Sequence, residues 1–351
     1  MISFDVCQCG APLQRNERPT PKPEGAQVLL KVLAAGVCHS DIHIWDGYYE
    51  MGAGKRMNLL DRGIKLPLTM GHENVGEVIA TGPDVKDVKI GDRRLVFPWI
   101  GCGQCNVCKA GEGQLCTTGP KFLGVFANGG YSDHLLVPHE RYLLDLAGLA
   151  PERAAPLACS GVTTYGALKK LGATMQREPL VVIGAGGLGF MCLALAKAMG
   201  SPGVIVVDID AAKRDAAIKA GATAAVDGKA ADAVAQLVKL TNGGAWNVID
   251  LVGSSQTVKL GIDCLTKGGK LVVVGLFGGD ITLSTPVIPL KAITIQGSYV
   301  GSLAELKELL DLVRQKGLPA LPVATRPLTS ADAALNDLRA GNVIGRLVLT
   351  P

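Results

Sequence analysis

The feature that most constrains the fold of this chain is a glycine-rich turn between an apolar run and an alanine-rich stretch. The apolar run starts at Leu180 and ends at Gly184, where the letters GAGGLG begin, and apolar and alanine residues then continue to Met199. The letters match G-x-G-x-x-G, which is a weak signal alone but a specific one between a strand and a helix. The segment therefore predicts the first βαβ unit of a dinucleotide-binding parallel sheet.

The turn residues have physical roles in holding a dinucleotide. Gly184 allows the tight turn, Gly186 lets the backbone approach a pyrophosphate, and Gly189 lets the helix pack closely on the strand. Asp208 ends the next apolar run and would accept hydrogen bonds from the adenosine ribose, while its charge repels a 2′-phosphate and favours NAD over NADP. A glycine-rich turn without a nucleotide is the alternative. The turn residues expected to contact the coenzyme are Gly184, Gly186, Gly187, Leu188 and Gly189.

Strand-like and helix-like segments alternate after about residue 155, which predicts a doubly wound parallel sheet. Aromatic residues make up only 4% of the chain, so the core consists mainly of Val, Leu, Ile and Ala, as is typical of buried parallel strands. The expected strands are 180–184, 204–208, 248–252, 270–275 and 292–296, and the expected helices are 188–199, 211–220, 230–240 and 256–265.

The segment before residue 155 has short apolar runs, such as 28–35 and 76–80, and dense turn signals, which are typical of a β-rich barrel. With 351 residues the chain is long enough for two domains. After Gly297 the pattern predicts a helix, 303–315, and then proline-punctuated strands that return to the first domain. We expect a β-rich domain at 1–155, completed by 297–351, and a dinucleotide-binding domain at 156–296.

Four cysteines lie in a short, glycine-rich lobe with the spacing C-x2-C-x2-C-x7-C, namely Cys102, Cys105, Cys108 and Cys116. Four thiolates from one loop can close a tetrahedron around zinc and leave no open position, which describes a structural site. An iron–sulfur cluster is the alternative. The bacterial ferredoxin spacing, however, places three residues before the fourth cysteine and a proline after it, whereas this chain has seven residues and Thr117.

A second possible metal site is dispersed along the sequence. Cys38, His72 and Cys159 offer two sulfur atoms and one nitrogen, and a catalytic zinc has few protein ligands and one position open for substrate. Each of these residues also has an ordinary alternative, because buried cysteines and buried, hydrogen-bonded histidines are common in protein cores.

The sequence around these candidates resembles a known family. The segment Gly71 to Gly76, GHENVG, resembles the G-H-E-x-x-G signature of zinc-containing medium-chain alcohol dehydrogenases, and Ala35 to Asp41 resembles their segment with the first zinc ligand. The cysteine lobe and the glycine turn follow in the same order. The resemblance implies a GroES-like catalytic domain, a Rossmann domain, and NAD-dependent oxidation of a primary or secondary alcohol, bulky or aromatic, to an aldehyde or ketone.

The resemblance also implies roles for individual residues. It places the catalytic zinc on Cys38, His72 and Cys159, with Glu73 as a neighbouring acid and Asp41 as the carboxylate that orients the ligand histidine. Cys159 rather than Glu at its position points to alcohols rather than polyols. The remaining implied roles are proton transfer by Ser40 and His43, nicotinamide contact by Thr163, adenosine contact by Lys213, and pyrophosphate contact by Arg346. His39 occupies a position at which several relatives have an arginine that binds the pyrophosphate.

The residues of the substrate pocket are less specific in the sequence. Trp99, Phe122, Leu276, Phe277 and Tyr299 are expected to form apolar walls, with ordinary core packing as the alternative. Trp45, Tyr48 and Tyr49 follow the first ligand segment and could border the same cleft.

Composition narrows the possible partners and location. The net charge of +4 is diffuse, so no nucleic-acid role is expected. The first ten residues lack a signal-peptide pattern, and glycines interrupt the longest apolar stretch, 179–200, so we expect no membrane span. Ten cysteines read as metal ligands or buried residues in a reducing cytoplasm. The resemblance implies two zinc ions per chain and a homodimer or homotetramer. Two alternative functions remain: an enzyme of the same scaffold that acts on a polyol, amino-alcohol or acyl-linked hydroxyl substrate, and a non-enzymatic binding protein of the same fold.

Overall fold

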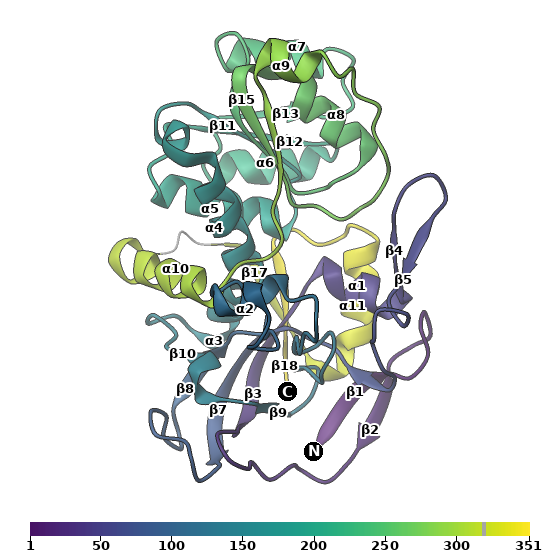
Figure 1. Ribbon diagram of the computed structural model, residues 1–351, viewed down its shortest axis with the longest axis vertical. Helices are drawn as coiled ribbons and strands as arrows, with labels where there is room; N and C mark the ends of the chain where they lie inside the picture. Colours follow the sequence, from purple (N-terminus) through teal and green to yellow (C-terminus); the bar gives the residue numbers. More distant parts are fainter. Residues whose placement is uncertain (318–320) are drawn as a thin grey trace.

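The structure, a computed structural model, describes residues 1–317 and 321–351, so residues 318–320 of the expected C-terminal completion lie outside the described residues. The molecule has two halves (Figure 1). Parallel strands and their helices form the upper half, and a β-rich assembly with both chain termini forms the lower half. The predicted combination of a β-rich domain with a doubly wound parallel sheet is confirmed.

The upper half is built on a parallel sheet whose order in the described chain is β13-β12-β11-β14-β15-β16. Counted from β11, this is the order 3-2-1-4-5-6, in which a dinucleotide binds where the order reverses, between β11 and β14. The strands are β11 (Leu180–Ile183), β12 (Val204–Asp208), β13 (Ala224–Asp227), β14 (Ala245–Asp250), β15 (Leu265–Val273) and β16 (Thr294–Gly297).

Helices follow most strands of this sheet and cover it. Asp210 and Ser254 act as N-caps, because the side-chain oxygen of each accepts hydrogen bonds from backbone N–H groups in the first turn of the following helix. Val181, Ile205 and Leu271 on the strands are fully or almost fully buried. The helices are α5 (Gly187–Ala198), α6 (Ala211–Lys219), α7 (Ala233–Leu240), α8 (Ser255–Asp263) and α9 (Val287–Lys291).

The lower half is organised around β3 (Val28–Val37), which pairs with β7 (Glu73–Thr81), β9 (His134–Val137) and β18 (Arg346–Thr350). The antiparallel register opposes Gly36 to Glu73, so the end of β3 lies beside the start of β7. The other strands of this half are β1 (Ile2–Val6), β2 (Gln14–Glu17), β6 (Leu68–Thr69), β8 (Arg93–Val96), β10 (Leu143–Leu144) and β17 (Val323–Pro327).

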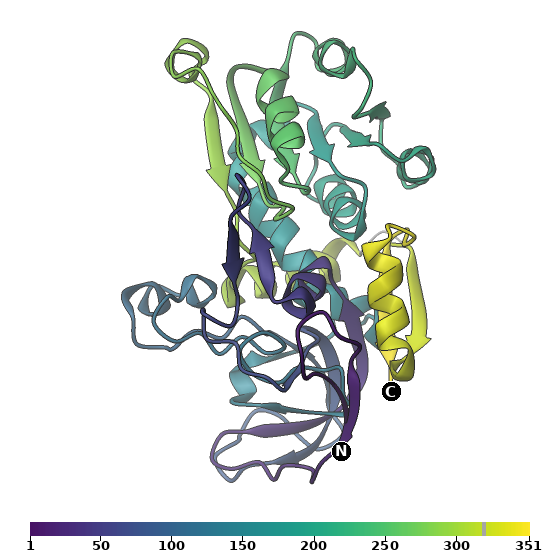
Figure 2. The same ribbon diagram turned by 90° about the vertical axis from the view of Figure 1, so that its right-hand side faces the viewer.

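The C-terminal segment returns to the lower half (Figure 2, yellow). After α10 (Leu303–Lys316), which packs on α4 (Ser160–Leu171), strands β17 and β18 pair in parallel and β18 joins β3. The sequence predicts strands here, but α11 (Ala331–Arg339) is a helix. Ala331, Ala334 and Leu335 are buried at helical spacing, so an amphipathic pattern was present in the sequence.

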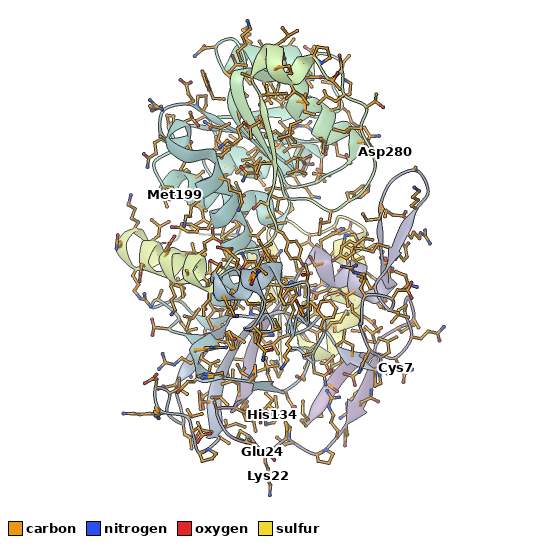
Figure 3. All side chains as sticks on the ribbon, in the orientation of Figure 1. Cys7, Lys22, Glu24, His134, Met199 and Asp280 are labelled. Atoms are coloured by element: carbon orange, nitrogen blue, oxygen red, sulfur yellow. The ribbon has the colours of Figure 1, made fainter. Side chains whose placement is uncertain are left out.

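Shorter elements bring the two halves together. A hairpin follows α1 (His39–Asp46) and rises beside the upper half (Figure 1). It consists of β4 (Tyr48–Glu50) and β5 (Arg56–Asn58). Its tip lies against the loop with Asp280, which is labelled at that edge in Figure 3. The remaining helices of the described chain include α2 (Asn106–Lys109) and α3 (Pro151–Ala154). No helix in the described ranges is both long and apolar enough to span a membrane.

Candidate active site and metal centres

Three distant segments of the chain converge on one buried cluster. Cys38 follows β3, His72 precedes β7, and Cys159 precedes α4. With Glu73, these residues place one sulfur, nitrogen or oxygen atom each within 4.8 Å of the others, and all four are buried. The β3–β7 register explains the proximity of Cys38 and His72, because both lie just beyond the paired residues Gly36 and Glu73.

Asp41 holds two members of this cluster in place. Its Oδ1 lies 3.0 Å from Nδ1 of His72, and its Oδ2 accepts hydrogen bonds from the Cys38 N–H and from the Tyr131 hydroxyl, each at 2.9 Å. Because Nδ1 is engaged, Nε2 of His72 is the nitrogen that faces the cluster, and this buried atom has no partner among the described residues.

This donor set fits zinc. An unpartnered imidazole nitrogen and two cysteine sulfur atoms 3.9 Å apart supply the nitrogen and sulfur ligands that zinc prefers. Glu73 is held nearby, because its Oε1 accepts hydrogen bonds from the Arg346 guanidinium and from the Ser160 N–H. Its Oε2 is buried and has no partner in the described part of the chain. Burial raises the pKa of Glu73 to about 7, against the lowering effect of the adjacent Arg346.

The cysteine lobe forms a second, more exposed cluster. The sulfur atoms of Cys102, Cys105, Cys108 and Cys116 all lie within 4.8 Å of one another. The N–H groups of Gln104 and Cys105 donate to the sulfur of Cys102, each at 3.4 Å, and such bonds stabilise a thiolate. Four sulfur donors from one loop fit a closed zinc site, so the prediction of two zinc sites is confirmed.

A cleft of about 340 Å³ lies between the two halves and reaches the buried cluster. It brings together most of the residues that the sequence predicts for catalysis, coenzyme binding and substrate binding. The predicted residues that line it are Cys38, His39, Ser40, His43, Trp99, Cys159, Thr163, Gly184, Gly186, Gly187, Leu188, Gly189, Asp208, Lys213, Leu276, Phe277, Tyr299 and Arg346, with Tyr49 beside them.

Three aromatic residues from the same prediction do not line the cleft. Phe122 is buried behind Trp99, and the two rings meet edge to face with centroids 5.5 Å apart. Trp45 is buried beneath the guanidinium of Arg339. Tyr48 lies beneath the guanidinium of Arg56. These rings therefore pack against other side chains and do not form walls of the cleft.

The glycine turn has the geometry that a dinucleotide requires. Gly184 has a φ of +101°, a conformation that favours glycine. A Cβ at Gly189 would overlap the Gly184 carbonyl oxygen, and one at Gly187 would overlap the Arg346 side chain. The Ala185 N–H donates to Asp208 at 2.7 Å, so the end of β12 lies against the turn. The residues present therefore fit a dinucleotide at the N-terminus of α5.

Comparisons with known proteins agree with this geometry. Residues 24–147 match the family described as the alcohol dehydrogenase GroES-like domain, and residues 187–315 match zinc-binding dehydrogenase. An NAD-dependent alcohol dehydrogenase of Sulfurisphaera tokodaii is 39% identical over 353 residues, with all of both chains covered. The chain belongs to the zinc-binding medium-chain alcohol dehydrogenase family.

Two further relatives show the breadth of this family. The crystal structure of an alcohol dehydrogenase from Aeropyrum pernix superposes with a TM-score of 0.89 at 32% identity, covering all of both chains. A D-arabinose 1-dehydrogenase (NADP(+)) of Saccharolobus solfataricus is 32% identical over 346 residues, covering 97% of this chain and 95% of the relative.

Helix α1 positions the two residues that the family resemblance implies for proton transfer. Ser40 and His43 lie on α1 and both line the cleft. The His43 ring is half-buried, 4.6 Å from the ring of Tyr49, and burial lowers its pKa to about 4. Thr163 is buried on α4, and its hydroxyl has no partner among the described residues, so it is available to a ligand.

The sequence analysis missed two residues that shape this site. Tyr131 is fully buried and holds Asp41, but it lies 90 residues away in the sequence and no local motif marks it. Arg339 lines the cleft from the end of α11, a helix that the sequence analysis replaced by strands. The amphipathic spacing of that helix was the available signal for Arg339.

Proposed function

We propose that this protein, an NAD-dependent zinc alcohol dehydrogenase, oxidises primary or secondary alcohols that carry a bulky or aromatic group, and gives aldehydes or ketones. The supporting observation is the apolar wall beside the metal cluster. Trp99 lies with its ring centroid 5.3 Å from that of His72, and Tyr299 lies 6.4 Å from Trp99 on the cleft side. Such walls favour apolar substituents over hydroxylated ones.

The chain's residues divide the catalytic work. Cys38, His72 and Cys159 would hold zinc, and the turn at Gly184 would hold NAD. When bound, zinc lowers the pKa of the substrate hydroxyl and NAD accepts the hydride. Ser40 and His43 carry the proton from the hydroxyl toward solvent. The aromatic wall keeps water away from the reacting carbon.

The proposed coenzyme preference rests on Asp208. Its side chain is half-buried at the end of β12, beside the glycine turn. A carboxylate at this position accepts hydrogen bonds from ribose hydroxyls and repels a 2′-phosphate. Lys213 also lines the cleft and would supply a cation on the adenosine side. This arrangement supports NAD over NADP.

A substrate panel tests the proposal. NAD reduction by the two-zinc protein is followed with ethanol, benzylic and branched secondary alcohols, amino alcohols, acyl-linked hydroxyl compounds and polyols, including D-arabinose. We expect the highest kcat/KM with the benzylic or branched alcohols. Tyr299→Ala should lower that value more than the value for ethanol, whereas Tyr48→Ala, outside the cleft, should leave the ratio unchanged. A preference for polyols or another alternative class would refute the substrate assignment, and the absence of turnover with every alcohol would support a binding protein.

We also propose that the chain forms a homo-oligomer. In the described part of the chain, β16 is an edge strand of the parallel sheet, and Ile295 on it is 40% exposed. Exposed apolar edge strands tend to pair with other chains. Light scattering should therefore give a mass of at least two chains, and a mass of one chain at micromolar concentration would contradict the proposal.

A further inference from the structure

The charges that line the cleft are unevenly distributed. Among the described residues around it, the permanent cations are Lys213, Arg339 and Arg346, and the one carboxylate is Asp208. Asp208 already accepts hydrogen bonds from the backbone N–H groups of Ala185 and Asp210, at 2.7 and 2.9 Å. The cleft is therefore suited to an anion such as a pyrophosphate, which carries two negative charges.

Arg346 alone does not neutralise those charges. It lies beside Gly187 at the glycine turn, but its guanidinium is paired with Glu73, and both residues are buried, at 5% and 0% exposure. When Glu73 is ionised, the pair has no net charge. His39 also lines the cleft. An imidazole, however, lacks the two parallel N–H donors with which a guanidinium binds a phosphate.

Arg339 is the exposed guanidinium of the cleft. It ends α11, and its side chain is 40% exposed. One nitrogen lies 2.5 Å from the Asp46 carboxylate, and the guanidinium carbon lies 4.4 Å from the centre of the Trp45 ring. The buried ring supports one face of the planar group, while Asp46 occupies one of its five N–H donors.

We propose that Arg339 is a coenzyme-binding residue that supplies a positive charge and N–H donors to the phosphates of the dinucleotide. The Trp45 ring supports the guanidinium at the cleft, whereas Asp46 competes with the phosphates for it. This inference rests on the proposed use of NAD. It adds a residue of α11, a helix outside the glycine fingerprint, to the coenzyme site. The ligand that Arg339 would bind is a nucleoside diphosphate.

The test is a fluorescence titration of the two-zinc protein with NADH, independent of turnover. Arg339→Gln should weaken the NADH Kd about tenfold at low ionic strength, as expected for the loss of one charge-assisted interaction. Arg326→Gln is the matched control. Arg326 forms a similar pair with Asp337 on α11 at 2.7 Å but does not line the cleft, so its replacement should leave the Kd unchanged.

Asp46→Asn separates an electrostatic role from a structural one. If Arg339 only joins α11 to α1 through the ion pair, both Arg339→Gln and Asp46→Asn should weaken NADH binding. If Arg339 binds the phosphates, Asp46→Asn removes a competing negative charge and should strengthen binding about two- to threefold. Weaker binding by Asp46→Asn would overturn the proposal.

Titrations with fragments of the coenzyme show which part of it Arg339 contacts. Arg339→Gln should weaken ADP-ribose about as much as NADH and leave adenosine unaffected, because adenosine has no phosphate. His39→Arg, which introduces a guanidinium elsewhere in the cleft, should restore part of the lost NADH affinity. An unchanged NADH Kd in folded Arg339→Gln would overturn the role of Arg339 while the proposed function stands. Failure of the unaltered protein to bind NADH would overturn both.

Discussion

At the scale of single residues, Asp41 shows how far the sequence reaches. Its carboxylate binds the Cys38 N–H and His72, and the first of these bonds is local, three residues along the chain. The family resemblance predicted Asp41 and the ligands Cys38 and His72, because they lie in short sequence motifs. Tyr131 supplies the third contact to Asp41 from a distant loop, and only tertiary structure reveals such a contact.

Cys159 provides a test of the buried metal cluster. Cys159→Ala removes one sulfur donor from a site whose surrounding β3, β7 and α4 are packed independently of it, so the protein should fold and bind NADH. Zinc analysis should fall from two ions per chain to one, and alcohol oxidation should become negligible. Cys7→Ser, which changes a cysteine outside both clusters, is the control. Retained activity at one zinc per chain would refute the ligand assignment.

The coenzyme preference can be tested at Asp208. Asp208→Ser removes the negative charge beside the glycine turn, where we propose that the ribose binds, and leaves a small polar side chain there. We expect kcat/KM with NADP to rise relative to NAD by about tenfold or more, because a charge repulsion of about 1.4 kcal/mol corresponds to that ratio. Asp215→Ser, on α6 outside the cleft, serves as the control. An unchanged ratio would place the discrimination elsewhere.

The proposed proton-transfer role of His43 predicts a pH dependence. An ordinary imidazole titrates near pH 6.5, but burial lowers the pKa of His43 to about 4, so the ring is neutral and able to accept a proton above that pH. Oxidation by the unaltered protein should therefore lose its His43-dependent activity only near pH 4. His43→Gln should slow oxidation on the order of 10²-fold at neutral pH, with partial rescue by added imidazole. Superimposable pH–rate profiles would assign His43 a packing role.

The same shift affects folding stability. The unfolded chain binds a proton at His43 below about pH 6.5, whereas the folded protein does so only below about pH 4. Because the unfolded state binds more protons between these values, the contribution of His43 to stability falls as the pH drops through this window. His43→Gln should therefore unfold with a weaker dependence on pH between 6.5 and 4.

At the scale of elements, strong local patterns predicted the structure and weak ones did not. Strand 204–208 and helix 303–315 were predicted within one residue of their observed ends, because apolar runs and caps mark them. Strand β13 was missed, since its four residues, AAVD, have little β propensity. It forms through pairing with β12, which is a tertiary effect.

The cysteine lobe is predicted to be a structural element that depends on its metal. Its α-helix, α2, has no buried residue, so apolar packing contributes little there. Cys105→Ser should leave one zinc per chain and lower the melting temperature by several degrees, because metal binding contributes directly to folding. The buried cluster should still support activity at moderate temperature. Melting behaviour equal to that of the unaltered protein, with the lobe zinc lost, would contradict this role.

At the scale of the whole molecule, the two halves are joined by contacts that no local pattern predicts. Arg346 begins the last strand of the lower half and lies against Gly187 of the upper half. At the other end of the cleft, the β4–β5 hairpin meets the loop after β15, where Gly52 and Gly279 approach so closely that a Cβ on Gly52 would lie 2.7 Å from the Gly279 carbonyl carbon. Leu276 and Phe277, just before this loop, line the cleft.

This contact predicts that Gly52 controls how the halves meet. Gly52→Ala introduces strain at a φ of +84° and a collision with the backbone of the opposite half. Gly54→Ala introduces similar strain at a φ of +71°, but its Cβ would meet no described atom within 4 Å. It therefore isolates the backbone cost of roughly 1–2 kcal/mol. Both variants should lose that stability, but only Gly52→Ala should also weaken NADH binding and raise KM for the alcohol, because it separates the walls of the cleft. Equal NADH affinity in the two variants would show that the hairpin contact does not position the halves.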